Sequence, residues 1–158
     1  MERASLDIRS GGFTLIELMV VVSLLAILAA LAGPSMAGLI ASQRVKSSAS
    51  ELHLALLKAR SEAIKRNGNV SLTPATGTNW SSGWNVVSGT VTLDSTGARN
   101  GVAISSNPTS LASIVFRYDG RTTAASNVNF QLSATSASAP RCVSIDATGR
   151  PYVKASAC

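Results

Sequence analysis

The first long stretch of the chain is apolar and carries a single charge. Between residues 13 and 32 only Glu17 is charged. A helix of that length, rising about 1.5 Å per residue, spans the hydrocarbon core of a bilayer. A carboxylate inside such a segment is costly to insert and usually marks a functional site that has a partner. We therefore predict a membrane-length helix in which Glu17 is compensated by assembly with other chains.

A different apolar pattern follows between residues 39 and 67. Apolar residues recur there at alternating spacings of four and three, which places them on one face of a helix. This stripe consists of Val45, Ala49, Leu52, Leu56, Ala59 and Ala63. Lys58 and Glu62 lie off the stripe at the spacing of an (i, i+4) ion pair. We predict one helix over 14–66, interrupted at Gly33-Pro34, with the stripe of its second half packed against a sheet.

Beyond the helix, short runs of β-branched and aromatic residues alternate with turn residues. The segment Asn67-Gly68-Asn69 ends the helix, with Gly68 as the predicted left-handed cap. Gly89, Gly120 and Gly149 supply turns between the strands that follow. The predicted strands lie near 70–73, 84–87, 90–93, 102–105, 113–117, 128–132, 142–146 and 151–153.

Composition limits what the residues after the helix can form. Only 4% of the 158 residues are aromatic, and small residues are plentiful in the roughly ninety residues left for a globular domain. The Ser- and Thr-rich segments 74–83 and 133–140 are predicted to be exposed loops. We predict an α+β fold, in which a long N-terminal helix packs on a small antiparallel β-sheet head, with no second domain.

Charge alone leaves two interpretations open. The formal net charge is +6, and it stays +6 without residues 1–12, which contain two basic and two acidic residues. A positive chain attracts anionic partners such as nucleic acid or anionic lipid surfaces. The same charge also serves solubility and repulsion between like subunits, which requires no partner.

The junction between the polar start and the apolar run carries a motif. The segment Gly12-Phe13-Thr14-Leu15-Ile16-Glu17 resembles the processing motif of type IV pilins and type II secretion pseudopilins. The resemblance implies that a prepilin peptidase cleaves between Gly12 and Phe13 and that Phe13 becomes an N-methylated terminus. It also implies that Glu17 pairs with the terminal amine of a neighbouring subunit. We predict that Glu17→Ala or Glu17→Leu still inserts in the membrane but fails to enter the fibre.

The same resemblance divides the chain and places it in the cell. It implies a prepilin leader (1–12), a transmembrane and fibre-core helix (13–38), an amphipathic helix (39–67) and a β-rich head (68–158). The precursor is expected in the bacterial inner membrane as a single-pass protein. The mature chain is then expected in a pilus or pseudopilus, in the periplasm or at the cell surface. Expected partners are the prepilin peptidase and other major and minor pilins or pseudopilins.

Three further segments narrow the resemblance to one branch. They are 58–64 on the helix, 114–121, and 142–150, the last two each being an apolar strand that runs into a Gly-Arg turn. Their order and spacing are similar to the GspH/FimT branch of minor pilins, which includes FimU-like proteins. The resemblance implies a structural subunit of a type IV pilus or a type II secretion pseudopilus.

Two other interpretations of the N-terminus compete with this one. A secretory signal peptide would use Ala30-Leu31-Ala32 as its cleavage site. It requires a cationic start, whereas Arg3 and Arg9 are balanced by Glu2 and Asp7. A plain single-span anchor is the second alternative. Both leave Glu17 in the apolar region without a role.

The two cysteines, Cys142 and Cys158, both fall in the last 17 residues. In a translocated chain an even number of cysteines indicates a disulfide. Closing a loop of about 15 residues removes about 3 kcal/mol of unfolded-state entropy. A metal site is not expected, because the only histidine, His53, lies on the predicted helix, where we expect it at the surface.

The residues do not suggest an enzyme or a cofactor. The predicted head lacks a histidine that would activate a Ser or Cys nucleophile. Two of its three carboxylates, Asp119 and Asp146, lie in turns where Asp is expected for backbone reasons. There is also no glycine-rich phosphate loop between a strand and a helix.

The alternative to a purely structural role is DNA binding during natural transformation. In the FimT branch the resemblance implies a C-terminal Gly-Arg-x-Arg turn that contacts double-stranded DNA. Here Gly149-Arg150-Pro151 matches its start, but Tyr152 stands in the place of the second Arg. A basic patch with Tyr152 as a stacking surface is the hypothesis. Its members are Arg121, Arg141, Arg150 and Lys154.

Overall fold

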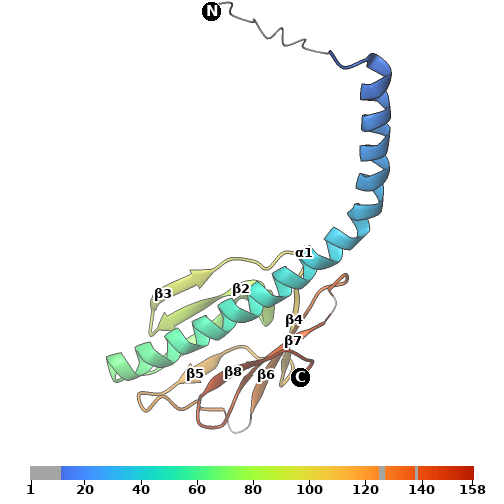
Figure 1. The fold of residues 1–158 in the computed structure, drawn as a ribbon. Helices are drawn as coiled ribbons and strands as arrows, with labels where there is room; N and C mark the ends of the chain where they lie inside the picture. Colours follow the sequence, from blue (N-terminus) through green and yellow to red (C-terminus); the bar gives the residue numbers. More distant parts are fainter. Residues whose placement is uncertain (1–11, 125–126, 138) are drawn as a thin grey trace, which may run out of the picture. The chain divides into compact units, whose positions relative to one another are not determined.

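The computed structural model describes residues 12–124, 127–137 and 139–158. Apart from Gly12, the predicted leader lies outside these residues. The chain divides into two compact units, Met1–Met36 and Ala37–Cys158. A single helix, α1 (Leu15–Arg66), contributes to both (Figure 1), and each unit is described by itself.

In the first unit, α1 leaves its apolar side chains uncovered. From Leu15 to Leu28 the large apolar side chains are between 45% and 77% exposed. Within the described residues, no helix combines the length and the apolarity that a bilayer crossing requires.

The interruption predicted at Gly33-Pro34 is wrong, since the backbone of α1 is helical through both residues. A proline removes only one backbone donor and crowds one carbonyl, so a helix can continue through it with a bend.

In the second unit, α1 packs its apolar stripe as predicted. All six stripe residues are at most 1% exposed, because helical spacing brings them to one side. Ala55 and Ser48, next to the stripe, are also buried. Figure 1 shows this half of α1 lying across the strands of the head.

The helix ends in a left-handed residue, but that residue is Asn67 (φ 49°) rather than Gly68. The Gly68 amide donates to the Ala63 carbonyl (3.1 Å) and the Asn67 amide donates to the Ile64 carbonyl (3.2 Å). These are the two bonds of a Schellman motif, in which Asn is the common alternative to Gly.

The head contains two antiparallel sheets rather than one. The first has the order β3-β2-β1-β5 and the second β4-β6-β7-β8. The strands are β1 (Val70–Thr76), β2 (Asn79–Ser88), β3 (Val91–Thr96), β4 (Ala103–Asn107), β5 (Ile114–Phe116), β6 (Val128–Ser133), β7 (Arg141–Ile145) and β8 (Pro151–Lys154). The sheets meet where the Ile104 amide of β4 donates to Ser81 Oγ of β2 (2.9 Å). Beside this bond the Arg99 amide, in the β3–β4 connection, donates to the Ser81 carbonyl (2.8 Å).

All eight predicted strands are present within a few residues of their predicted positions. The main difference is segment 74–83, predicted as an exposed loop, which forms the paired ends of β1 and β2 around Gly77 (φ 54°). Trp80 lies in this hairpin and is 1% exposed, with its ring 4.7 Å from that of Phe130. The hairpin therefore extends the core across both sheets.

Candidate functional site

The N-terminal residues of α1 are organised by Thr14. The Thr14 carbonyl accepts the hydrogen bond of the Leu18 amide (3.2 Å). The Thr14 hydroxyl Oγ1 accepts the hydrogen bond of the Glu17 amide (3.3 Å). Together these bonds identify Thr14 as the N-cap of α1. The signal for this cap is the sequence Thr-x-x-Glu before an apolar run, which our sequence analysis did not use.

Glu17 lies in the first turn of α1 and is exposed. Its carboxylate forms no hydrogen bond or ion pair with the other described residues. A carboxylate in the first turn is favoured by the helix dipole. It is also available to a cation from another molecule, with which it would form a charge-assisted hydrogen bond.

The predicted cleavage site precedes this turn. Gly12, Phe13 and Thr14 lie outside the helix, and the Phe13 side chain is 81% exposed. The peptide between Gly12 and Phe13 is thus in non-helical backbone two residues before α1. Its cleavage and the methylation of Phe13 stay predictions.

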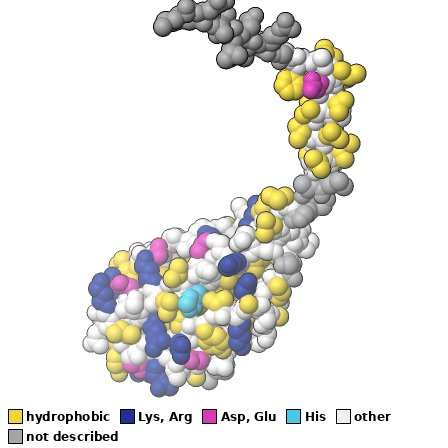
Figure 2. All heavy atoms as spheres, in the orientation of Figure 1, with side chains coloured by type: hydrophobic (Ala, Val, Ile, Leu, Met, Phe, Trp, Pro, Cys, Tyr) yellow, Lys and Arg dark blue, Asp and Glu magenta, His cyan; other side chains and the backbone are white. Residues whose placement is uncertain are grey.

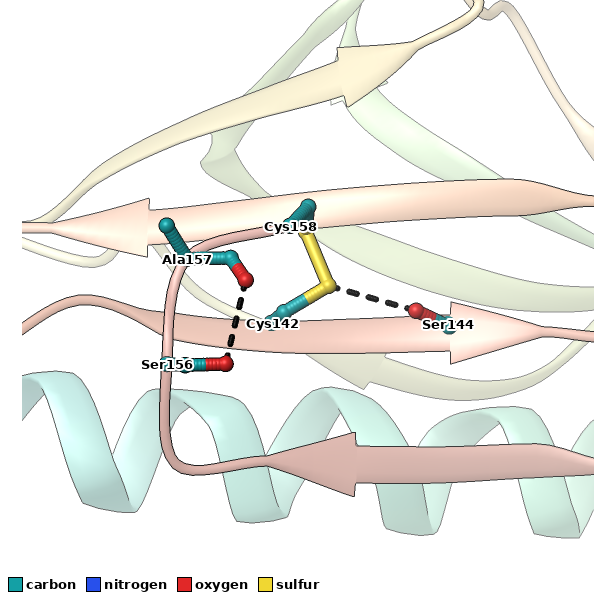
Figure 3. The surroundings of a disulfide bond; sticks show 5 residues. All are labelled: Cys142, Ser144, Ser156, Ala157 and Cys158. Carbon is teal, nitrogen blue, oxygen red and sulfur yellow. Dashed lines mark hydrogen bonds between the residues drawn. A yellow bond between two sulfur atoms is a disulfide. The ribbon is translucent and has the colours of Figure 1, made fainter.

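The predicted disulfide between Cys142 and Cys158 is present, with the two Cα atoms 5.1 Å apart (Figure 3). Cys142 lies on the central strand β7 and is fully buried, and its Sγ is 3.2 Å from the Ser144 hydroxyl. The residues after β8 turn back toward β7, where Ser156 donates to the Ala157 carbonyl. The disulfide therefore fastens the chain end to the interior of the second sheet.

The two Gly-Arg segments form tight turns held by aspartates. Asp119 accepts the Arg121 amide (3.0 Å). Asp146 Oδ1 accepts the Thr148 amide (2.9 Å), the Thr148 hydroxyl (2.6 Å) and the Arg150 amide (2.9 Å). These bonds, the Thr148 hydroxyl first, lower the pKa of Asp146 below its usual value. As predicted, both aspartates serve the backbone of their turns.

The two turns pack against each other. A methyl group placed on Gly149 would lie 2.3 Å from the Gly120 carbonyl oxygen and 3.0 Å from the Arg121 Cα. Arg121 and Arg150 therefore emerge from adjoining backbones. A methyl group placed on Gly120 would lie 3.1 Å from the Arg60 Nε atom. Arg60 thus brings a third guanidinium to this junction, which our sequence analysis missed because α1 and the turn are distant in sequence.

Arg141 and Lys154 lie at the other end of the β7–β8 hairpin. Cys142 pairs with Lys154 at that end, whereas Ile145 pairs with Pro151 beside the turn. Four residues of strand, roughly 14 Å, separate the two ends. Lys154 Nζ lies 5.4 Å from the centre of the Tyr152 ring. The four predicted DNA-binding residues thus lie at two separate places, Arg121 and Arg150 beside the turn and Arg141 and Lys154 at the far end of the hairpin. Figure 2 shows basic side chains scattered over the visible face with carboxylates between them.

Several other cations of the second unit are held in ion pairs. Lys58 contacts Asp94 (2.7 Å) and Arg66 contacts Glu62 (2.6 Å), so the predicted Lys58–Glu62 pair is wrong. Arg99 binds Glu51 and stacks 5.5 Å above the Trp84 ring, which joins the β3–β4 connection to α1. These partners were not predictable from spacing along the helix.

His53 is half-buried rather than at the surface, and its Nε2 lies 3.3 Å from the Pro151 carbonyl oxygen. Among the described residues, no group of three or more His, Cys, Asp and Glu side chains is arranged to hold a metal ion.

Comparison with known proteins gave matches of two kinds. Residues 48–149 match the family model described as type II transport protein GspH. Residues 8–33 match the prokaryotic N-terminal methylation motif. A search of curated proteins found no match.

The structure is similar to crystal structures of the type IV minor pilin FimU from Pseudomonas aeruginosa strain PAO1. One has a TM-score of 0.63 at 19% sequence identity, covering 71% of this chain and 89% of FimU. A second crystal form gives 0.62 at 19% identity, covering 69% and 91%. At this identity the likeness concerns the fold.

Proposed function

Because the chain belongs to the GspH family of minor pilins and pseudopilins, we propose that it is a structural subunit. In this proposal it takes part in the assembly of a type IV pilus or a type II secretion pseudopilus. In this role the Phe13–Gly38 segment packs among other subunits, and the head faces neighbouring subunits or a cargo. Before assembly the segment anchors the precursor in the inner membrane, and a prepilin peptidase removes residues 1–12.

The observation that carries this proposal is the state of Glu17. Its carboxylate is exposed in the first turn of a helix whose apolar side chains are uncovered, and no described residue of the same chain pairs with it. Inside an apolar assembly an unpaired carboxylate is unfavourable. An amine at Phe13 of a neighbouring subunit supplies the missing cation. Neither group is stable alone there, so the pair sets the register between an incoming and a seated subunit.

The matched methylation motif over residues 8–33 supports the processing step. Hydrolysis between Gly12 and Phe13 creates the amine that Glu17 requires. Methylation at Phe13 leaves that nitrogen basic, so its positive charge is kept.

Fibre incorporation tests the proposal. We expect Glu17→Ala and Glu17→Leu to reach the membrane at the wild-type level, while their amount in purified fibres falls at least about tenfold. Glu62→Leu, which removes a carboxylate from the second half of α1, is the matched control and should incorporate normally. Normal incorporation of both Glu17 variants would refute the proposal.

DNA uptake is the second candidate, and the packing of the two turns is the observation that favours it. This contact places the backbones at Arg121 and Arg150 side by side, with the Arg60 side chain near Gly120, while Asp119 and Asp146 accept backbone amides. Such a cluster suits phosphate groups, which dominate affinity for duplex DNA. Tyr152 in place of a second arginine weakens the parallel with the Gly-Arg-x-Arg turn.

Duplex-DNA binding by the oxidised protein over a salt series tests this candidate. It predicts binding on the order of micromolar at low salt that weakens steeply as salt rises. Arg121→Ala with Arg150→Ala should abolish binding, and Arg141→Ala with Lys154→Ala is the matched control of equal charge. Equal losses in the two double variants would indicate non-specific attraction, and no binding at low salt would leave the assembly role alone.

A further inference from the structure

The proposed cleavage site and Glu17 lie on opposite sides of Thr14, the residue at which α1 begins. The Thr14 carbonyl and hydroxyl oxygens accept the amides of Leu18 (3.2 Å) and Glu17 (3.3 Å). In a complete capping box the Glu side chain would return a hydrogen bond to the cap residue. Among the described residues Glu17 makes no such bond. Thr14 Oγ1 is therefore the side-chain atom that fixes this end of the helix.

This cap determines at which residue α1 begins and therefore which residues precede it. With Thr14 as N-cap, α1 starts at Leu15, and Gly12 and Phe13 remain outside it with exposed side-chain and backbone surface. Glu17 then occupies the third helical position. Without the cap oxygen, the first turn frays and the start of the helix varies, because one of its free amides loses its acceptor.

We propose that Thr14 is a positioning residue for leader removal, holding the Gly12–Phe13 peptide in accessible non-helical backbone at a fixed distance before α1. The inference rests on the proposed function, since it takes the chain as a substrate of the prepilin peptidase. The matched methylation motif over residues 8–33 independently marks this segment as one on which enzymes act. Hydrolysis breaks the C–N bond, with water giving its hydroxyl to the Gly12 carbonyl carbon and a proton to the Phe13 nitrogen.

The same cap prepares the product for assembly. Cleavage leaves the new amine one residue before Thr14, and the bond from the Glu17 amide keeps the glutamate in the first turn. The positions of the amine and of the carboxylate are then both defined relative to one helix end. A frayed turn would spread the carboxylate over several positions and weaken recognition by a neighbouring subunit.

The test is cleavage of the full-length precursor in membrane vesicles by prepilin peptidase, with kcat and KM measured separately. Thr14→Val keeps the shape but lacks the acceptor oxygen, and Thr14→Ser restores it. Ser23→Ala removes another side-chain bond within α1, from Ser23 to the Met19 carbonyl, and is the matched control. We expect Thr14→Val to raise KM about fivefold with kcat little changed, because only the capped fraction binds productively. Thr14→Ser and Ser23→Ala should behave like wild type.

An unchanged KM in Thr14→Val, with wild-type precursor cleaved normally, would overturn this inference and leave the proposed function intact. A wild-type precursor that is not cut between Gly12 and Phe13 would overturn both. Amide exchange in the full-length precursor checks that the effect is local. Exchange at Glu17 should quicken about fivefold in Thr14→Val while Leu25 is unaffected, and faster exchange along all of α1 would also refute the inference.

Discussion

The two compact units treat apolar side chains in opposite ways. In the first, Leu24 is 56% exposed and its apolar neighbours along α1 are similarly uncovered. In the second, Leu52 on the same helix is fully buried against the sheets. Burial of apolar surface is the main source of folding stability. The head is thus stabilised by its own residues, whereas the first unit leaves its apolar surface uncovered, which in the proposed role is covered by lipid or other chains.

The largest expected effect tests this contrast with one substitution made in both units. Leu52→Ala should lower the free energy of unfolding of the head by about 2–5 kcal/mol, because it leaves a cavity in the core. Leu24→Ala removes the same atoms from an exposed site and should change it by less than about 0.5 kcal/mol. Denaturant unfolding followed by tryptophan fluorescence measures this, since Trp80 and Trp84 both lie in the head core. Equal effects would contradict the contrast.

The disulfide provides the next largest effect. Cys142→Ala with Cys158→Ala should lower the stability of the head by about 3 kcal/mol, because the closed loop no longer restricts the unfolded chain. Ser144→Ala, which removes only the polar contact of Cys142, is the control and should cost much less. The same unfolding assay applies, and a double variant as stable as Ser144→Ala would show that the disulfide adds little.

Arg99 links α1 to the head through Glu51 and the Trp84 ring, and its substitution tests how much this linkage stabilises the head. Arg99→Ala should cost about 1–3 kcal/mol, since it removes the bond to Glu51 and the contact with the Trp84 ring. Arg141→Ala is the matched control, because none of the described ion pairs involves Arg141. Thermal unfolding of the two variants under identical conditions separates this linkage from a loss of charge. An equal shift in both would mean that charge alone matters.

The smallest effect concerns pH. The hydrogen bond from Lys58 lowers the pKa of Asp94 below its ordinary value of 3.8. Because the pKa of Asp94 is lower in the folded protein than in the unfolded chain, its ionised form favours folding. This stabilisation is fully present above the unfolded-state pKa and is lost as the pH falls through the folded-state pKa. We expect head stability to fall below about pH 4, and both Asp94→Asn and Lys58→Met to flatten that fall. Thermal midpoints between pH 2 and pH 7 measure it, and an unchanged slope in both variants would contradict the prediction.

Local patterns predicted much of this fold, because the same residues that form an element also signal it. The stripe from Val45 to Ala63 and the eight strands are of this kind. Two sheets instead of one, the Trp80 hairpin and the ion pairs of Lys58 and Arg99 were missed, because they depend on contacts between distant segments. Asn67 replaced Gly68 at the helix end since Asn also tolerates the left-handed conformation.

The candidate site also contains features that are local in the sequence and features that depend on packing between distant segments. The motif around Gly12, Phe13 and Glu17 is local and could be predicted, since its residues are consecutive along the chain. Whether Arg121 and Arg150 meet depends on the packing of two glycine turns against each other, which no spacing along the chain reveals. Thr14 was visible in the sequence, but its role became apparent only from its hydrogen bonds.

The most direct test of the assembly role is fibre incorporation of Glu17→Gln. This variant keeps the size of the side chain and its ability to form hydrogen bonds but removes the negative charge. If Glu17 pairs with a terminal amine of a neighbouring subunit, Glu17→Gln should be nearly as depleted from purified fibres as Glu17→Leu, with both present in the membrane at the wild-type level. Incorporation of Glu17→Gln at the wild-type level would show that no charge pair is formed and would contradict the account.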